Sequence, residues 1–174
     1  TQVAEMPDGT RFFGIARTIE RGGSGFHAPR KWFAIGLGCE LQHAHELVYA
    51  DGTRYQGGFK QGRMHGEGHL QQGGVSYRGE FRDDRYHGLG TLEWPDGSRY
   101  QGRFVRGEPE GEGLRSNAEG QFSGTFKNGM LQGEGSYQGE DGERYSGGFR
   151  NDQFHGKGRY QSGEGEVWSG HFAN

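Results

Sequence analysis

The stretch Tyr77-Arg78-Gly79-Glu80-Phe81 decides the fold, because its pattern of aromatic, any residue, Gly, any residue, Phe recurs along the chain. The first aromatic residue of the pattern returns at intervals of 22 or 23 residues. It stands at Tyr55, Tyr77, Tyr100, Phe122, Tyr145 and Trp168. A fixed period of this length is typical of repeat architectures, so the repeating unit is the feature to interpret.

A second element, two Gly separated by one residue, follows the first at a constant distance. The pairs are Gly66 and Gly68, Gly88 and Gly90, Gly111 and Gly113, Gly133 and Gly135, and Gly156 and Gly158. His65, His87 and His155 precede three of the pairs, and Glu110 and Gln132 precede the other two. Several positions therefore recur together at one period.

Each unit reads as one β-hairpin. Tyr77, Gly79 and Phe81 alternate with charged residues, which is the period of a half-buried strand. Residues 82–87 have turn composition, 88–93 form the returning strand, and 94–97 turn into the next unit. One face of each strand is thus expected to be aromatic and the other wet.

The composition predicts a thin core of rings over glycine. The chain has 174 residues, of which 37 are Gly, while only 29% are apolar and 13% aromatic. Gly inside a strand is weakening unless another group approaches closely. We expect a ring of one strand to lie over the Gly of its neighbour, so that a Cβ at Gly79 or Gly90 would displace the ring.

These motifs resemble the MORN (membrane occupation and recognition nexus) family, whose unit has an aromatic-x-Gly-x-aromatic strand, a short loop and a Gly-x-Gly strand. The resemblance implies an all-β fold, an elongated twisted antiparallel sheet of stacked hairpin repeats of about 23 residues. Residues 55–174 are expected to hold five full units and a truncated sixth.

Residues 1–54 are interpreted as a degenerate first unit. The segment 6–12 aligns with 94–100, and 51–55 repeats the Asp-Gly-Thr-Arg-Tyr closure. The spacing between these anchors predicts a 13-residue insertion within 17–33 and a second of about seven residues around 42–48.

Charge and motif content argue against several function classes. The net charge of −3 offers no basic field for nucleic acid, and no phosphate loop or nucleophile motif is present. We expect no enzyme activity, no catalytic residue, no cofactor and no metal. His43 and His45, with Cys39 and Glu46 nearby, are the strongest alternative metal ligands, but an exposed insertion loop is preferred.

The chain is expected to act in the cytoplasm. It has a single cysteine, so no disulfide can form within it, and no stretch approaches the roughly 18 apolar residues of a membrane span. It begins and ends within a repeat, which suggests a piece of a longer protein.

The expected function is a scaffold that binds a partner protein, as a helix or extended peptide, because a single-layer sheet cannot cover all of its rings. The resemblance adds a cytoskeletal, ciliary or membrane-junction role as an implication. The expected contacts are the rings and the loop arginines Tyr55, Phe59, Tyr77, Phe81, Tyr100, Phe104, Tyr145, Phe149, Arg63, Arg85 and Arg106.

Three alternatives remain open. Arg17, Arg21, Arg30 and Lys31 form a local basic segment that could contact an anionic phospholipid of a membrane or an acidic partner. The chain could instead be a regulatory appendage of an enzyme whose catalytic part is absent. The sheet end at 168–174 could also pair end to end with a second copy.

Overall fold

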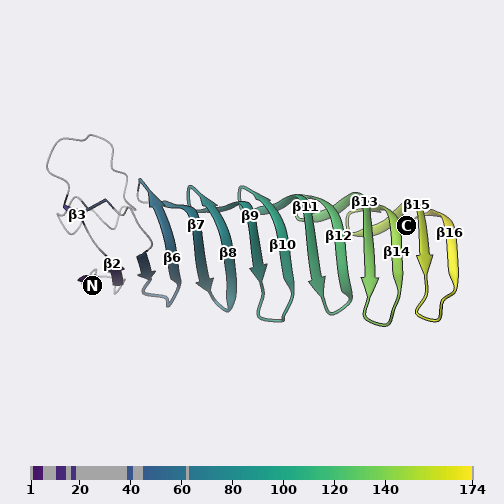
Figure 1. Ribbon diagram of the computed structural model, residues 1–174, viewed down its shortest axis with the longest axis horizontal. Helices are drawn as coiled ribbons and strands as arrows, with labels where there is room; N and C mark the ends of the chain where they lie inside the picture. Colours follow the sequence, from purple (N-terminus) through teal and green to yellow (C-terminus); the bar gives the residue numbers. More distant parts are fainter. Residues whose placement is uncertain are drawn as a thin grey trace. The chain divides into compact units, whose positions relative to one another are not determined.

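The computed structural model describes residues 2–5, 11–14, 17–18, 39–40, 45–61 and 63–173, with side chains for 46–61 and 63–173 (Figure 1). All secondary-structure elements in these ranges are β-strands. The chain divides into two compact units, Thr1–His87 and Gly88–Asn174.

The first unit contains eight described strands. They are β1 (Gln2–Glu5), β2 (Arg11–Gly14), β3 (Arg17–Thr18), β4 (Cys39–Glu40), β5 (His45–Val48), β6 (Arg54–Lys60), β7 (Arg63–Gln72) and β8 (Val75–Arg82). Their hydrogen-bonded order is β1-β2-β5-β6-β7-β8, and β3 pairs with β4 in a separate two-stranded sheet.

The second unit continues the same pattern. Its strands are β9 (Arg85–Glu93, which begins before the boundary), β10 (Arg99–Val105), β11 (Glu108–Asn117), β12 (Gly120–Lys127), β13 (Met130–Gly139), β14 (Arg144–Arg150), β15 (Gln153–Gln161) and β16 (Val167–Phe172). Each strand from β9 to β16 pairs antiparallel with the next. The all-β, antiparallel hairpin fold expected from the sequence is confirmed.

Two kinds of turn join the strands. The short turns have two central residues with positive φ, such as Asp83 (50°) and Asp84 (67°), which is the left-handed geometry of tight hairpins. The longer turns contain Asp-Gly or, between β15 and β16, Glu164-Gly165, and in the turn after β9 the Trp94 N–H donates to Ser98 O at 2.9 Å. The Tyr49 N–H donates to Thr53 O at 2.8 Å in the same way. The alignment of Asp51-Gly52 with Asp96-Gly97 is therefore reproduced in the backbone.

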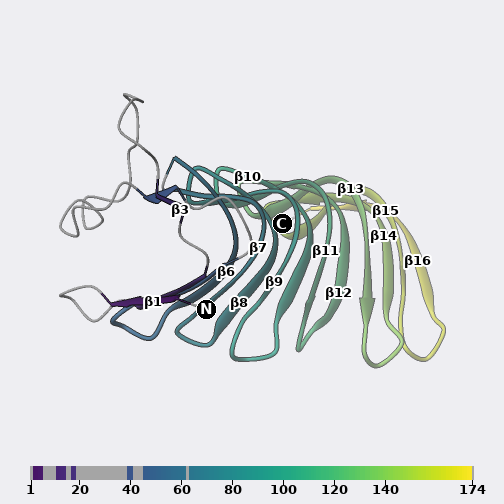
Figure 2. The ribbon, with the colours of Figure 1, turned by 60° about the vertical axis from the view of Figure 1, so that its left-hand side comes forward.

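A β-bulge shapes the aromatic strands β6, β10, β12 and β14, and in three of them a tyrosine hydroxyl bonds to the bulged carbonyl. In β6 the pairing register shifts between Gly57 and Phe59, and the Tyr55 hydroxyl donates to Gly58 O at 2.7 Å. The same register shift occurs in β10, β12 and β14. Bulges bend a strand, and the strands of the second unit are visibly curved (Figure 2).

The glycine floor predicted from the sequence is confirmed. Gly102 pairs with Gly113 across β10 and β11. A Cβ built on Gly102 would lie 2.6 Å from the Gly113 Cα and 2.8 Å from the Tyr100 hydroxyl oxygen. A Cβ on Gly68 would likewise lie 2.6 Å from the Tyr55 hydroxyl oxygen. No side chain fits between these strands and the ring that covers them.

The core is a series of rings packed edge to face. The ring centroid of Tyr55 is 5.0 Å from that of Phe59 on the same strand and 5.2 Å from that of Phe81 in the next repeat, with interplanar angles of 81° and 84°. Tyr100 makes the matching contacts with Phe104 and Phe126. Such pairs add to the burial of their apolar area. A single layer of sheet therefore buries most of these rings almost completely.

Candidate functional site

The predicted contact rings lie in the core. Seven of the eight are no more than 3% exposed, so a partner could reach little of their area without moving other side chains. Only Phe59 is half-buried. The fully buried rings are Tyr55, Tyr77, Phe81, Tyr100, Phe104, Tyr145 and Phe149. They are first of all structural, and a contact surface has to be sought beside them.

The predicted basic residues have two different outcomes. Arg63, Arg85 and Arg106 are exposed next to the short turns, where they are free to meet a partner. Arg17 contributes backbone to β3, whereas Arg21, Arg30 and Lys31 lie outside the described residues.

The side chains that would test a metal site are also not described, since His43 is outside the described ranges and only the backbones of Cys39 and His45 are included. In the described part of the chain no three His, Cys, Asp or Glu side chains gather as a metal ion would require. Nor does that part contain a helix long and apolar enough to cross a membrane.

The first aromatic residues of the repeats form a column across the sheet, which we call the tyrosine column. In each returning strand one residue pairs with this column, and the identity of that residue varies between repeats. The pairs include Tyr55 with Leu70, Tyr100 with Leu92 and Arg115, and Tyr145 with Tyr137 and Tyr160. Leu70 and Leu92 are buried, whereas Arg115, Tyr137 and Tyr160 are half-buried. The column therefore changes from core to accessible surface.

A groove of about 600 Å³ lies where this column is accessible. We call it the aromatic groove. Its aromatic lining is Phe122, Tyr137, Phe154, Tyr160 and Phe172, and its other lining residues are Glu119, Glu143, Asp152, Gln153 and Ala173. They belong to β12–β16 and the turns between these strands, except for Glu119 in the turn before β12 and Ala173 directly after β16. The groove thus combines ring faces with three carboxylates.

Tyrosine hydroxyls order one side of the groove. The Tyr160 hydroxyl donates to Glu143 Oε1 at 2.6 Å, and the Tyr137 hydroxyl donates to Glu119 O at 2.9 Å. The hydrogen bond to the Glu143 carboxylate raises the pKa of Tyr160 to about 12. Burial, followed by the charges of Glu143, Asp141 and Glu119, raises the pKa of Tyr137. Both phenols therefore stay neutral at ordinary pH and lie in a negative potential.

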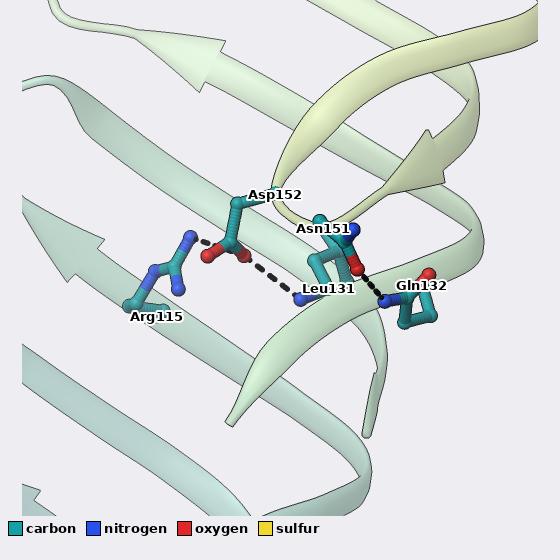
Figure 3. Close-up of polar contacts among 5 residues, drawn as sticks. All are labelled: Arg115, Leu131, Gln132, Asn151 and Asp152. Atoms are coloured by element: carbon teal, nitrogen blue, oxygen red, sulfur yellow. Dashed lines mark hydrogen bonds and ion pairs between the residues drawn. The ribbon is translucent and has the colours of Figure 1, made fainter. Parts of the chain in front are cut away.

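An internal ion pair orders the other side (Figure 3). Arg115 Nη2 is 2.9 Å from Asp152 Oδ1, which also accepts a hydrogen bond from the Leu131 N–H at 2.8 Å. The Arg115 guanidinium carbon is 5.1 Å from the centroid of the Phe122 ring, a cation–π distance. Asp152 lies in the turn after β14, so this cluster fixes that turn on β13.

The described side chains of the groove offer ring faces and carboxylates to a ligand. Rings and carboxylates together favour apolar groups that carry positive charge. The sequence reasoning missed this site because it concentrated on the constant rings. The available signal was the change from Leu70 and Leu92 to Tyr137 and Tyr160 at equivalent positions.

A family model described as MORN repeat matches residues 55–72, 77–99, 100–121, 122–144 and 145–167. The resemblance to MORN repeats is therefore confirmed over residues 55–167, whereas the division into five full units and a truncated sixth stays a prediction. A different model, described as the C-terminal part of a short-chain fatty acyl coenzyme A regulator, matches residues 1–62. No observation tests the interpretation of residues 1–54 as a degenerate repeat, which stays a prediction beside this second match.

Curated relatives agree with the second match. The chain is 51% identical over 59 residues to the propionyl-CoA carboxylase regulator of Cereibacter sphaeroides, covering 34% of this chain and 13% of that protein. It is 52% identical over 56 residues to the HTH-type transcriptional regulator RamB of Mycobacterium tuberculosis, covering 32% and 12%. It is 55% identical over 52 residues to the regulator PrpR of the same species, covering 30% and 11%.

The chain therefore spans about an eighth of the length of the curated relatives it matches. These relatives are bacterial regulators, and they give the cytoskeletal and ciliary expectation no support.

Proposed function

Because the chain belongs to the MORN repeat family, we propose that its repeats form a non-enzymatic scaffold for a partner protein and that the aromatic groove receives a helix or extended peptide of that partner. The observation that carries this proposal is the accessible column of Tyr137 and Tyr160, which lies beside rings that are otherwise buried.

The volume and the chemistry of the groove support this proposal. Its volume of about 600 Å³ lies within the range of about 300 to 1,000 Å³ typical of ligand sites. Tyrosine is among the residues that most often dominate interface energies, because it buries a large rigid ring and keeps a polar end. The exposed Arg106, in the short turn between β10 and β11, is a secondary contact in this proposal.

The setting we propose is transcription regulation in the cytoplasm. Residues 1–62 are similar to the C-terminal part of regulators whose names refer to short-chain acyl coenzyme A and propionyl-CoA carboxylase. The repeats would then connect such a regulator domain to another protein. This setting develops the expectation of a regulatory appendage, with a regulator in place of an enzyme.

Membrane binding is the less supported alternative. The aromatic groove has no cluster of basic residues that could contact anionic lipid, and the net charge of the chain is −3. Stable attachment to an anionic surface usually needs a polybasic cluster or a lipid anchor. Sedimentation with anionic vesicles that is lost on neutralising Arg17, Arg21, Arg30 and Lys31 would favour the membrane alternative over the scaffold.

Site-specific photo-crosslinking tests the scaffold proposal. A photoreactive amino acid is placed at Ala173 in the groove or, as the matched control, at the exposed Ser146 on the strand face opposite to Tyr145. We expect one discrete crosslinked protein from position 173 only, and expect the same product with the purified partner. Equal labelling from both positions, or none from position 173, would contradict the proposal.

A further inference from the structure

We propose that the aromatic groove selects a basic segment of its partner, in which an arginine side chain lies against Tyr137 and Tyr160 and pairs with the carboxylates of Glu119 and Glu143. This inference rests on the proposed scaffold function and adds the chemistry of the bound peptide.

The charges of the groove are unbalanced. Its lining contains three carboxylates and no Lys or Arg. The unit Gly88–Asn174 as a whole has nine Lys and Arg against thirteen Asp and Glu, a balance of −4, so the groove lies in the more acidic part of the chain. A partner of opposite charge would be attracted to it and oriented by it.

The two carboxylates on the Tyr137 side lack a basic partner. Among the described residues, Asp152 is the groove acid that forms an ion pair, with Arg115, while neither Glu119 nor Glu143 forms one. Glu143 is half-buried and is held in place by the Tyr160 hydroxyl at 2.6 Å. A held carboxylate loses less conformational freedom when it binds a cation, because its position is already set.

Arg115 shows how this surface accommodates a guanidinium. It combines a ring contact, 5.1 Å from Phe122, with a carboxylate contact, 2.9 Å from Asp152. Tyr137, Tyr160 and Glu143 offer the same two elements on the other side of the groove, where no side chain of the described residues supplies the cation. A planar guanidinium fits such a site better than an ammonium group does, since it can stack and donate hydrogen bonds together.

The rings are also arranged with space between them. Phe154 stacks on Tyr145 at 3.8 Å and 11°, which closes that contact. Tyr137 and Tyr160 instead lie 5.8 Å and 6.4 Å from Phe154, at interplanar angles of 50° and 48°. Tyr137 also lies 4.7 Å from Phe122 at 35°, and Tyr160 lies 5.5 Å from Trp168 at 36°. These contacts are tilted rather than stacked, and both tyrosines are half-buried, so part of each ring face stays accessible to a flat group.

Fluorescence anisotropy with defined peptides tests the inference. The probe is a fluorescein-labelled 16-residue amphipathic peptide with Leu on one face and Arg on the other. Its counterparts replace every Arg by citrulline, which has the same shape without the charge, or by Lys. The protein variants are Glu119→Gln with Glu143→Gln and, as a matched control, Glu134→Gln with Glu164→Gln. Circular dichroism checks that both are folded.

We expect the citrulline peptide and the groove variant each to weaken binding by about tenfold, equivalent to about 1.4 kcal/mol, and the Lys peptide to bind more weakly than the Arg peptide. The control variant should bind like the parent protein. Equal weakening in the control would show bulk attraction and overturn the inference, as would equal binding of the Arg and Lys peptides.

The design separates this inference from the scaffold proposal. If the citrulline peptide binds as tightly as the Arg peptide and position 173 still gives its crosslink, the groove binds peptides without charge selection. In that case the scaffold stands and the arginine site falls. If neither peptide binds and position 173 gives no crosslink, both proposals fail.

Discussion

The hairpins β6–β7 and β14–β15 share a backbone but differ in what they leave accessible. Both have a bulge three residues after the tyrosine, and the tyrosine hydroxyl donates to the bulged carbonyl at 2.7 Å in one and 2.9 Å in the other. Opposite the tyrosine, however, the first hairpin has Leu70, which is buried, and the second has Tyr160, which is half-buried and bonded to Glu143.

The difference shows how one repeat can build both a core and a site. The glycine, tyrosine and phenylalanine columns fix the backbone, because they set the bulge and the distance between strands. The column opposite the tyrosine is not constrained in this way, so it can change from Leu to Arg or Tyr while the hairpin keeps its form. Recognition is thus added to this fold by changing side chains in one column.

Gly102→Val should have the largest effect, because it attacks the shared backbone. A Cβ there would lie 2.6 Å from both the Glu112 carbonyl oxygen and the Gly113 Cα, and backbone atoms cannot move aside as a side chain can. We expect a loss of about 3 kcal/mol in the free energy of unfolding, measured by urea denaturation. Tyr100→Phe is the comparison, and an equal loss in both variants would count against the glycine floor.

The next effect separates the two hairpins directly. Leu70→Ala removes a buried side chain and should cost about 2 to 3 kcal/mol, whereas Tyr160→Ala removes a half-buried one and should cost about 1 kcal/mol. Thermal and urea unfolding of the two variants would measure this difference. If Tyr160→Ala were as costly as Leu70→Ala, Tyr160 would be core and the aromatic groove would lose its main binding surface.

Much of this architecture was predictable from the sequence. The period of 22 or 23 residues, the alternation at Tyr77, Gly79 and Phe81, and the paired glycines all follow from local rules that the structure obeys. The degree of ring burial was not predictable, because it depends on the bend of the sheet. The bulge that contributes to this bend, between Gly57 and Phe59, has no sequence signature separate from the motif itself.

The site was harder to predict than the fold. Tyr137 and Tyr160 stand after the paired glycines, at the position that Leu70 and Leu92 occupy, and the sequence does not show that they are half-buried while Tyr145 is buried. Glu119 and Glu143 lie 24 positions apart and meet in one groove through the stacking of units. Arg115 and Asp152 are 37 residues apart, a separation at which no local pattern pairs two charges.

High pH distinguishes the buried column tyrosines from an ordinary phenol. Burial raises the pKa of Tyr100 to about 12, above the value of 10.0 expected when the chain unfolds. The protonated phenol is favoured by folding, so the stabilisation is complete below pH 10 and is lost as pH rises toward 12. We expect the unfolding free energy to fall by about 1.4 kcal/mol per pH unit for each such tyrosine in that window.

Urea denaturation between pH 8 and pH 11 measures this slope. Tyr100→Phe should reduce it, because the variant removes one titrating group from the unfolded chain. A curve that stays flat above pH 10 in the parent protein would show that the column tyrosines ionise without strain. That result would contradict their close fit over the glycines.

The smallest effect concerns the one full unit that departs from the tyrosine rule. Phe122 occupies the tyrosine column but has no hydroxyl, whereas the equivalent Tyr100 donates to the bulged Arg103 carbonyl at 3.0 Å. The equivalent acceptor for residue 122 is the carbonyl of Thr125, which lies at the same bulge position. Phe122→Tyr should therefore add a hydrogen bond worth about 1 kcal/mol, and Tyr100→Phe should lose a similar amount.

Opposite changes in the free energy of unfolding of the two variants, measured by urea denaturation, would show that the hydroxyl stabilises the bulge. A loss of stability in Phe122→Tyr would instead mean that the Arg115 guanidinium, 5.1 Å from the Phe122 ring, has altered the packing of this unit. The fourth unit would then be a local adaptation around the Arg115 and Asp152 ion pair, and the groove would begin there because the regular packing of the core ends there.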